Sequence, residues 1–244
     1  MTELSISTPH HRLKSYLATP QGTGPWPGVI VLHDIFGLTD VTRGHADWLA
    51  SAGYLAVAPD LFSWGGRIRC IRALMLDLAA RKGAAFDDVD AIRQWFAGRQ
   101  DCTGKVGVIG FCATGGFAIL LAAGHGFSAV APNYGQVPND IDAILNGACP
   151  VVASFGGRDR TLKGAAARLE GALARQQIEH DVKEYPDAGH SFLDHHKGLV
   201  GGIGAVLGVF IGAGYNDKDA ADARSRIRTF FARHLAQAAV SKER

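Results

Sequence analysis

Short apolar runs rich in β-branched residues alternate in this chain with longer stretches whose apolar residues recur at helical spacing. Buried strands are expected at 29–32, 55–58, 106–109, 129–131 and 151–154, a further strand at 180–185, and helices at 86–96, 117–123, 162–173 and 223–231. Strands that alternate with helices predict an α/β fold with a doubly wound, mostly parallel sheet and helices on both faces. In such sheets ligands bind at the carboxyl ends of the strands, so functional residues are expected there.

Composition supports a globular chain. Hydrophobic residues make up 47% of the 244 residues, which is too many for a disordered chain, and the 31 glycines follow no collagen period. The length is compatible with one α/β domain or with two small ones. We interpret residues 1–244 as one domain.

Charge and cysteine usage limit the partners. The 25 Lys and Arg and 23 Asp and Glu are spread along the chain, so nucleic acid is not an expected partner. Residues 1–11 are polar and resemble no signal peptide, which predicts a cytoplasmic protein. The four cysteines lack CxxC spacing, so we expect free thiols and no metal site.

Residues 198–214 differ from the rest of the chain, because they carry no charge and include seven glycines. The segment is shorter than the ~20 residues of a membrane span, and its glycines weaken a helix, so no membrane role is expected. It is interpreted as a buried or flap-like insertion near the active site, or as a subunit contact that would make a homodimer possible.

A nucleophile elbow is predicted around Cys112. The strand at 106–109 turns abruptly through residues 110–116 and continues as an apolar helix, which is the context that this motif requires. Gly110 provides the small residue before the nucleophile, whereas Thr114 stands where the motif expects glycine. Cys112 would lie at a helix N-terminus, which favours a thiolate. The alternative is a buried structural cysteine.

Two later loops offer partners in the chain order nucleophile, acid, histidine. Asp159 follows the strand at 151–154, and His190 follows the strand at 180–185, so both are expected at the sheet edge that carries Cys112. Asp159 could instead cap a helix that begins near Thr161. His190 is one of ten histidines, and its place in this order distinguishes it from the others.

Acyl transfer also needs hydrogen-bond donors for an oxyanion. The backbone N–H after the nucleophile belongs to Ala113, and the loop after the strand at 29–32 offers that of Ile35. Alternatively, Ile35 is only a hydrophobic anchor in a plain strand-to-helix turn.

These residues together resemble the dienelactone hydrolase family of α/β-hydrolases over about residues 27–236. The matching motifs, in order, are LHDIFGL (32–38), APDLF (58–62), VIGFC (108–112), GGRD (156–159) and AGHSF (188–192). The resemblance implies a triad of Cys112, His190 and Asp159 that hydrolyses an ester or lactone through a thioester acyl-enzyme, without a cofactor.

The resemblance also implies roles for residues around the triad. Asp34 stands where the family usually has a glutamate that contacts the resting thiol; alternatively, its carboxylate bonds backbone amides in its own loop. Phe36, Trp64 and Phe192 are expected to line the substrate pocket.

The substrate is expected to differ from dienelactone itself. Trp64 and Asp194 occupy the two places where enzymes that hydrolyse this anion are expected to carry arginines, and Asp194 would repel an anion. The surface arginines that could compensate are Arg67, Arg69 and Arg160. We therefore predict a family-like hydrolase that acts on a neutral or differently shaped small ester or lactone and turns over dienelactone inefficiently. The alternative function is a catalytically weak scaffold that binds a small molecule, which Thr114 and the absent arginines favour.

Asp194, His195 and His196 are not expected to bind a metal, because adjacent histidines point in different directions.

Overall fold

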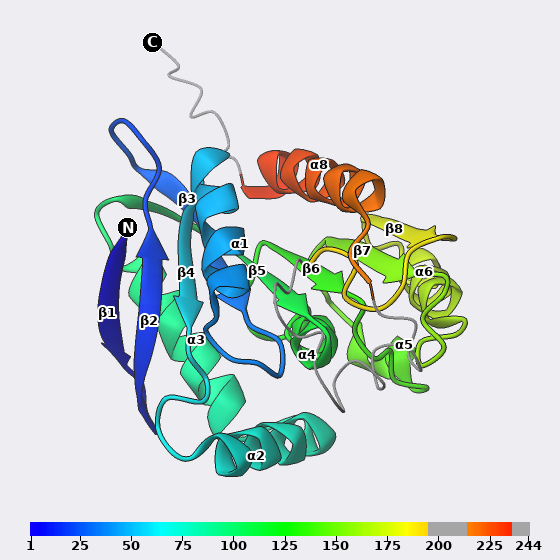
Figure 1. Ribbon diagram of the computed structural model, residues 1–244, viewed down its shortest axis with the longest axis horizontal. Helices are drawn as coiled ribbons and strands as arrows, with labels where there is room; N and C mark the ends of the chain where they lie inside the picture. The colour runs from blue at the N-terminus through cyan, green and yellow to red at the C-terminus, as the bar shows by residue number, and fades with distance from the viewer. Residues whose placement is uncertain (195–213, 236–244) are drawn as a thin grey trace.

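A computed structural model describes residues 1–194 and 214–235 of the chain. It contains an eight-stranded sheet in the order β1-β2-β4-β3-β5-β6-β7-β8 (Figure 1). The strands are β1 (Thr2–Ser7), β2 (Arg12–Ala18), β3 (Trp26–Leu32), β4 (Leu55–Pro59), β5 (Cys102–Phe111), β6 (Ala129–Asn133), β7 (Val151–Gly156) and β8 (His180–Tyr185). The parallel pairing of β3 with β4 and β5, and onward to β8, confirms the six predicted strands and the α/β class.

The sequence patterns missed β1 and β2. Both strands run antiparallel to their neighbours at one edge of the sheet, and β2 joins β1 to β4. Most residues of β1 are exposed, so its sequence lacks the continuous apolar run that identified the central strands.

Seven helices are described, and apolar spacing predicted α3, α4, α6 and α8. The full set is α1 (Asp40–Ser51), α2 (Arg67–Ala80), α3 (Ala84–Ala97), α4 (Ala113–Leu120), α5 (Ile141–Ile144), α6 (Ala165–Arg175) and α8 (Asp217–Leu235). The predicted helix near Thr161 begins later, at Ala165, because residues before it form turns. None of the helices in the described ranges is long and apolar enough to cross a membrane.

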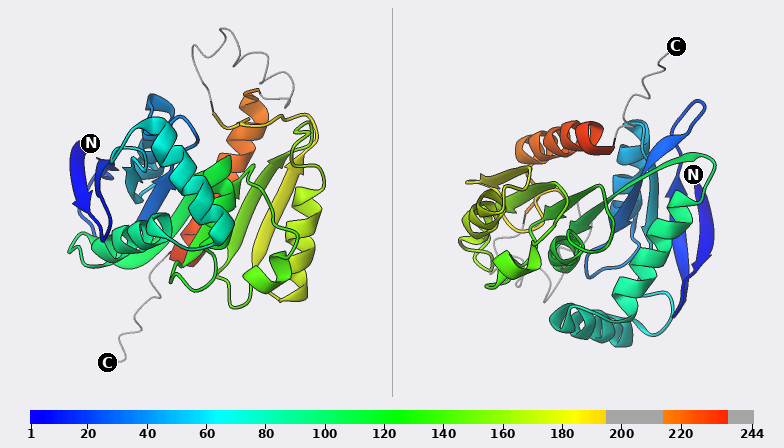
Figure 2. Two further views of the ribbon diagram at one scale, coloured as in Figure 1. Left: turned by 90° about the horizontal axis from the view of Figure 1, so that it is seen from below. Right: turned by 180° about the vertical axis from the view of Figure 1, so that it is seen from behind.

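Two glycines in neighbouring strands show how the helices cover both faces. A Cβ on Gly28 of β3 would lie 3.2 Å from the ring of Phe96 in α3, whereas one on Gly107 of β5 would lie 3.0 Å from Leu235 in α8. Gly28 pairs with Val106, so Gly28 and Gly107 point to opposite faces. Helix α1 shares the face of α8, since Tyr54, in the short connection from α1 to β4, contacts Phe231. Helices α3, α4 and α6 cover the other face (Figure 2).

The carboxyl ends of the parallel strands bring several loops to one edge. The loops after β3, β5, β6, β7 and β8 carry Ile35, Cys112, Tyr134, Asp159 and His190. Of the predicted insertion at 198–214, only Gly214 belongs to the described residues, so its predicted role lies outside them.

Candidate active site

Cys112 occupies the turn between β5 and α4 in the backbone conformation that a nucleophile elbow needs. Its φ and ψ are 57° and −121°, an uncommon region for a residue with a side chain. Its N–H donates to the carbonyl of Asn133 at 3.1 Å, which ties the turn to the end of β6. A Cβ on Gly110 would lie 2.0 Å from the Thr114 carbonyl oxygen, so only glycine fits there.

Thr114 fits the elbow in place of the expected glycine. Its buried hydroxyl accepts a hydrogen bond from the Phe111 N–H at 3.0 Å and lies 3.0 Å from the carbonyl oxygens of both Leu32 and Phe111. The side chain therefore links the ends of β3 and β5, and the departure from the motif does not distort the turn.

Asp159 and His190 meet across two loops. The Asp159 Oδ2 lies 2.5 Å from the His190 Nδ1, and both side chains are buried. The other carboxylate oxygen accepts from the N–H and hydroxyl of Thr161 at 2.9 and 2.7 Å. Asp159 thus binds the backbone of Thr161, as the helix-cap interpretation predicted, and it also binds the histidine. Helix α6 itself begins beyond this turn.

Hydrogen bonding sets the charge of this pair. Burial opposes ionisation of Asp159, but the hydrogen bonds from His190 and Thr161 lower its pKa below the usual value. Burial also opposes protonation of His190, yet the hydrogen bond with Asp159 and the neighbouring Cys112 thiol raise its pKa to about 10. Both neighbours therefore favour the protonated imidazolium form of His190.

The two predicted oxyanion donors lie in different surroundings. Ala113 is the first residue of α4, and Ile35 is exposed in the loop after β3. Among the described residues, neither N–H has a hydrogen-bond acceptor. The guanidinium of Arg67 donates to the Ile35 carbonyl oxygen at 3.0 Å, so this arginine contacts the loop from outside.

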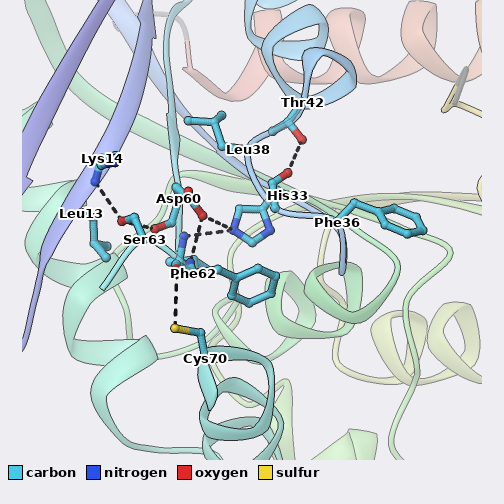
Figure 3. Close-up of polar contacts among 12 residues, drawn as sticks. Leu13, Lys14, His33, Phe36, Leu38, Thr42, Asp60, Phe62, Ser63 and Cys70 are labelled. Atoms are coloured by element: carbon cyan, nitrogen blue, oxygen red, sulfur yellow. Dashed lines mark hydrogen bonds and ion pairs between the residues drawn. The ribbon is translucent and has the colours of Figure 1, made fainter. Parts of the chain in front are cut away.

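His33 fixes the loop that carries Asp34 and Ile35 (Figure 3). Its Nε2 accepts from the Leu61 N–H at 2.9 Å, which leaves the proton on Nδ1, 2.6 Å from the Asp34 carbonyl oxygen. Complete burial lowers the pKa of His33, so the ring is neutral. The buried Asp34 carboxylate accepts a hydrogen bond from the Phe36 N–H at 2.8 Å. This is the bond to a backbone amide of its own loop that we gave as the alternative to contact with the thiol. Contact between Asp34 and the thiol stays a prediction.

The three predicted pocket residues lie in different places. Phe36 is half-buried, and Figure 3 shows its ring directed away from Phe62 and Cys70. Phe192 is fully buried and packs against Tyr134. Trp64 stacks on His11 at 4.2 Å and lines a cavity of about 120 Å³ beside α2 and α3. Its ring contacts are with His11 and Arg69, and its place in the substrate pocket stays a prediction.

Asp194 departs furthest from its expected role. A charge facing the substrate is expected there, but the side chain is buried, 2.7 Å from His45 Nε2 and 2.6 Å from the Tyr134 hydroxyl. No signal in the sequence points to His45 or Tyr134, because His45 is 149 residues from Asp194 and no local motif links them. His195 and His196, which were not expected to bind a metal with Asp194, lie outside the described residues.

Known proteins share both the sequence pattern and the fold of this chain. The model of the dienelactone hydrolase family matches residues 13–235. The chain belongs to the dienelactone hydrolase family. Its relatives include two proteins named "Putative carboxymethylenebutenolidase". The one from Yersinia pestis is 29% identical and the one from Escherichia coli K12 is 30% identical, each over 207 residues. The first match covers 78% of both chains, and the second covers 77% of this chain and 76% of the relative.

Solved structures of this family share the fold. The crystal structure of a "Putative Dienelactone Hydrolase" from Klebsiella pneumoniae has a TM-score of 0.75 and 26% identity, and the match covers 95% of this chain and 97% of that one. Membership of the α/β-hydrolase superfamily, which the motifs implied, is thereby confirmed, and the chain is a hydrolase of the dienelactone hydrolase family.

Proposed function

We propose that this family member hydrolyses carboxylic esters or lactones with Cys112 as nucleophile. The observation that carries the proposal is that the buried Asp159–His190 pair, with 2.5 Å between Oδ2 and Nδ1, lies at the same sheet edge as Cys112 in its positive-φ turn, and that the thiol helps to raise the pKa of His190. The order nucleophile, base and orienting acid is the arrangement that nucleophilic acyl transfer requires.

The proposed reaction has two halves. The Cys112 Sγ attacks the carbonyl carbon, while the N–H groups of Ala113 and Ile35 donate to the developing oxyanion. The carbon–oxygen bond to the alcohol breaks, and His190 gives the alcohol oxygen a proton, leaving a thioester on Cys112. His190 then takes a proton from water, the hydroxide attacks the thioester, and the carboxylic acid leaves as the thiolate forms again. Asp159 orients the imidazole throughout, and no cofactor takes part.

The substrate is proposed to be uncharged near the scissile bond. The names of the relatives point to the dienelactone class. In this chain, however, Asp194 is buried and hydrogen-bonded, Trp64 stacks on His11, and Arg67 is exposed. None of these side chains is arranged to bind a substrate carboxylate, so we expect slow turnover of the anionic dienelactone.

A panel of short activated esters and lactones tests the proposal. Turnover is expected for the wild type, with a loss of at least ~10³-fold in kcat in Cys112→Ala, because the residual rate must come without covalent catalysis. Cys70→Ala is the matched control, since the Cys70 thiol is buried beside the Phe62 carbonyl and takes no proposed role. Undiminished activity in Cys112→Ala would rule out the triad.

Alkylation provides a second measurement. Burial raises the pKa of Cys70 and Cys102 and raises that of Cys149 to about 12, so iodoacetamide is expected to label Cys112 first. If no ester or lactone reacts and Cys112 is not labelled first, the small-molecule-binding scaffold becomes the better description of this chain.

A further inference from the structure

A buried polar cluster lies beside the proposed triad and has no part in the chemistry above. It consists of His45 in α1, Tyr134 after β6 and Asp194 in the loop after β8, and we call these three residues the Asp194 cluster. They are exposed by 4%, 1% and 4%. Asp194 joins the other two, because one of its oxygens lies 2.7 Å from His45 Nε2 and the other accepts from the Tyr134 hydroxyl at 2.6 Å.

Both ends of the cluster touch residues at the reacting groups. The His45 ring stacks on Phe111, the residue before Cys112, with centroids 4.2 Å apart and planes within 14°. The Tyr134 ring meets that of His190 edge-on, with centroids 5.3 Å apart. Asp194 itself lies in the turn after His190, where its N–H donates to the Ser191 carbonyl at 2.9 Å. The cluster therefore connects the residue before the nucleophile with the histidine loop.

The position of Tyr134 is fixed independently of its hydroxyl. Its N–H donates to the Ser154 carbonyl at 2.8 Å, and its φ is 39°. The next residue, Gly135, packs so closely on α4 that a Cβ there would lie 2.2 Å from the carbonyl carbon of Gly115. The backbone at Tyr134 is thus held against the first turn of α4, and the hydroxyl extends from this fixed point to the histidine loop.

We propose that Asp194 is a positioning residue that holds His190 at its working distance from Cys112, through Tyr134 on one side and His45 on the other. The inference rests on the proposed function. Asp159 anchors only the Nδ1 edge of the imidazole, whereas His190 must serve first the alcohol and then water from its other side. The ring of Tyr134, tied through Asp194, limits how far His190 can tilt. Misplacing a catalytic group by about 1 Å can slow a reaction by about 10²-fold.

The decisive comparison is between two buried tyrosines. Tyr134→Phe removes the hydroxyl that reaches Asp194, and Tyr185→Phe removes one that donates to Asp222 at 2.7 Å. Tyr185 is also buried, and its ring contact with Phe192 survives the change to phenylalanine. Tyr134→Phe loses one buried hydrogen bond to an aspartate, whereas Tyr185→Phe loses a partly buried one to Asp222 and a bond of 3.2 Å from Arg226, so both melting temperatures are expected to fall.

The kinetics should separate them. We expect Tyr134→Phe and Asp194→Ala to lower kcat for the best ester about 10- to 100-fold with KM changed less than about 3-fold, and Tyr185→Phe to stay within about 3-fold of the wild type. Asp194→Asn keeps an oxygen that can accept from Tyr134, so it should retain more activity than Asp194→Ala.

Other outcomes overturn the inference. Equal kcat in Tyr134→Phe and Tyr185→Phe would make the Asp194 cluster purely structural, and a raised KM with unchanged kcat would make it part of substrate binding. An active Cys112→Ala would instead overturn the proposed function, so the two failures are distinguishable.

Discussion

At the scale of single residues, the ionisation of His190 is set by its neighbours rather than by its burial. Desolvation alone would favour the neutral ring, but the hydrogen bond with Asp159 and the neighbouring Cys112 thiol raise its pKa to about 10. The same contact with His190 helps to lower the pKa of Asp159. The protonated histidine and its partners are therefore a source of folding stability as well as the proposed catalytic base.

The pH dependence of stability tests this ionisation. Because folding raises the His190 pKa from 6.5 to about 10, its contribution is fully present below pH 6.5 and is lost as the pH rises through 10. The difference in melting temperature between the wild type and His190→Gln should therefore shrink from pH 6.5 to pH 10, as followed by circular dichroism. A difference that stays constant or grows over this range would contradict the raised pKa.

At the scale of elements, the strand–turn–helix unit of β5 and α4 depends on one hydroxyl. Thr114 accepts from the Phe111 N–H and reaches two carbonyl oxygens at the ends of β3 and β5. A glycine at this position has no hydroxyl, so these backbone groups would need other hydrogen-bond partners. The threonine is therefore compatible with the turn geometry of an elbow, and its presence no longer favours the scaffold alternative.

Replacing Thr114 should show the value of that hydroxyl. Thr114→Val keeps the shape but buries polar backbone groups without their partner, so the free energy of unfolding should fall by about 1–3 kcal/mol. Thr114→Ser keeps the hydroxyl and should lose less. Urea denaturation measures both, and equal stability of Thr114→Val and wild type would show that the hydroxyl contributes little.

At the scale of the whole molecule, the site exists because parallel strands end at one edge. The loops after β7 and β8 pack backbone to backbone, since a Cβ on Gly156 would lie 2.4 Å from the Gly189 carbonyl oxygen and 2.7 Å from that of Ala188. The Arg158 N–H also donates to the Ala188 carbonyl at 2.9 Å. This close approach is what brings Asp159 to His190.

Gly156→Ala should therefore separate the two loops. We expect a loss of about 1–3 kcal/mol in unfolding free energy from overpacking, and at least about a 10-fold loss of esterase activity from the displaced Asp159–His190 pair. Gly44→Ala is the matched control, because Gly44 is exposed on α1 and a Cβ there would meet open space. Alanine at this helical position should stabilise the protein by about 0.5–1 kcal/mol. Wild-type activity in Gly156→Ala would mean that the loops can separate without harm.

Local patterns alone determined much of this protein. Apolar patterns predicted five of the parallel strands and four of the helices, because each buried segment must carry its own apolar residues. The sequence also predicted the turn at Gly110–Cys112 and the strand ends before Asp159 and His190. Parallel strands all end at the same edge of the sheet, so residues that follow them are expected at that edge. The mostly exposed β1 and the polar-interrupted β2 carried no such continuous apolar run.

Only the tertiary structure decided what Asp194 does. Its charge and its place after His190 suggested contact with substrate, whereas it is buried against His45 and Tyr134 from distant parts of the chain. Trp64 likewise packs on His11, from a distant part of the chain. The physical reason is the same in both cases. A polar or aromatic side chain takes its partners from whatever the packed fold places beside it, and such contacts leave no periodic or local trace in the sequence.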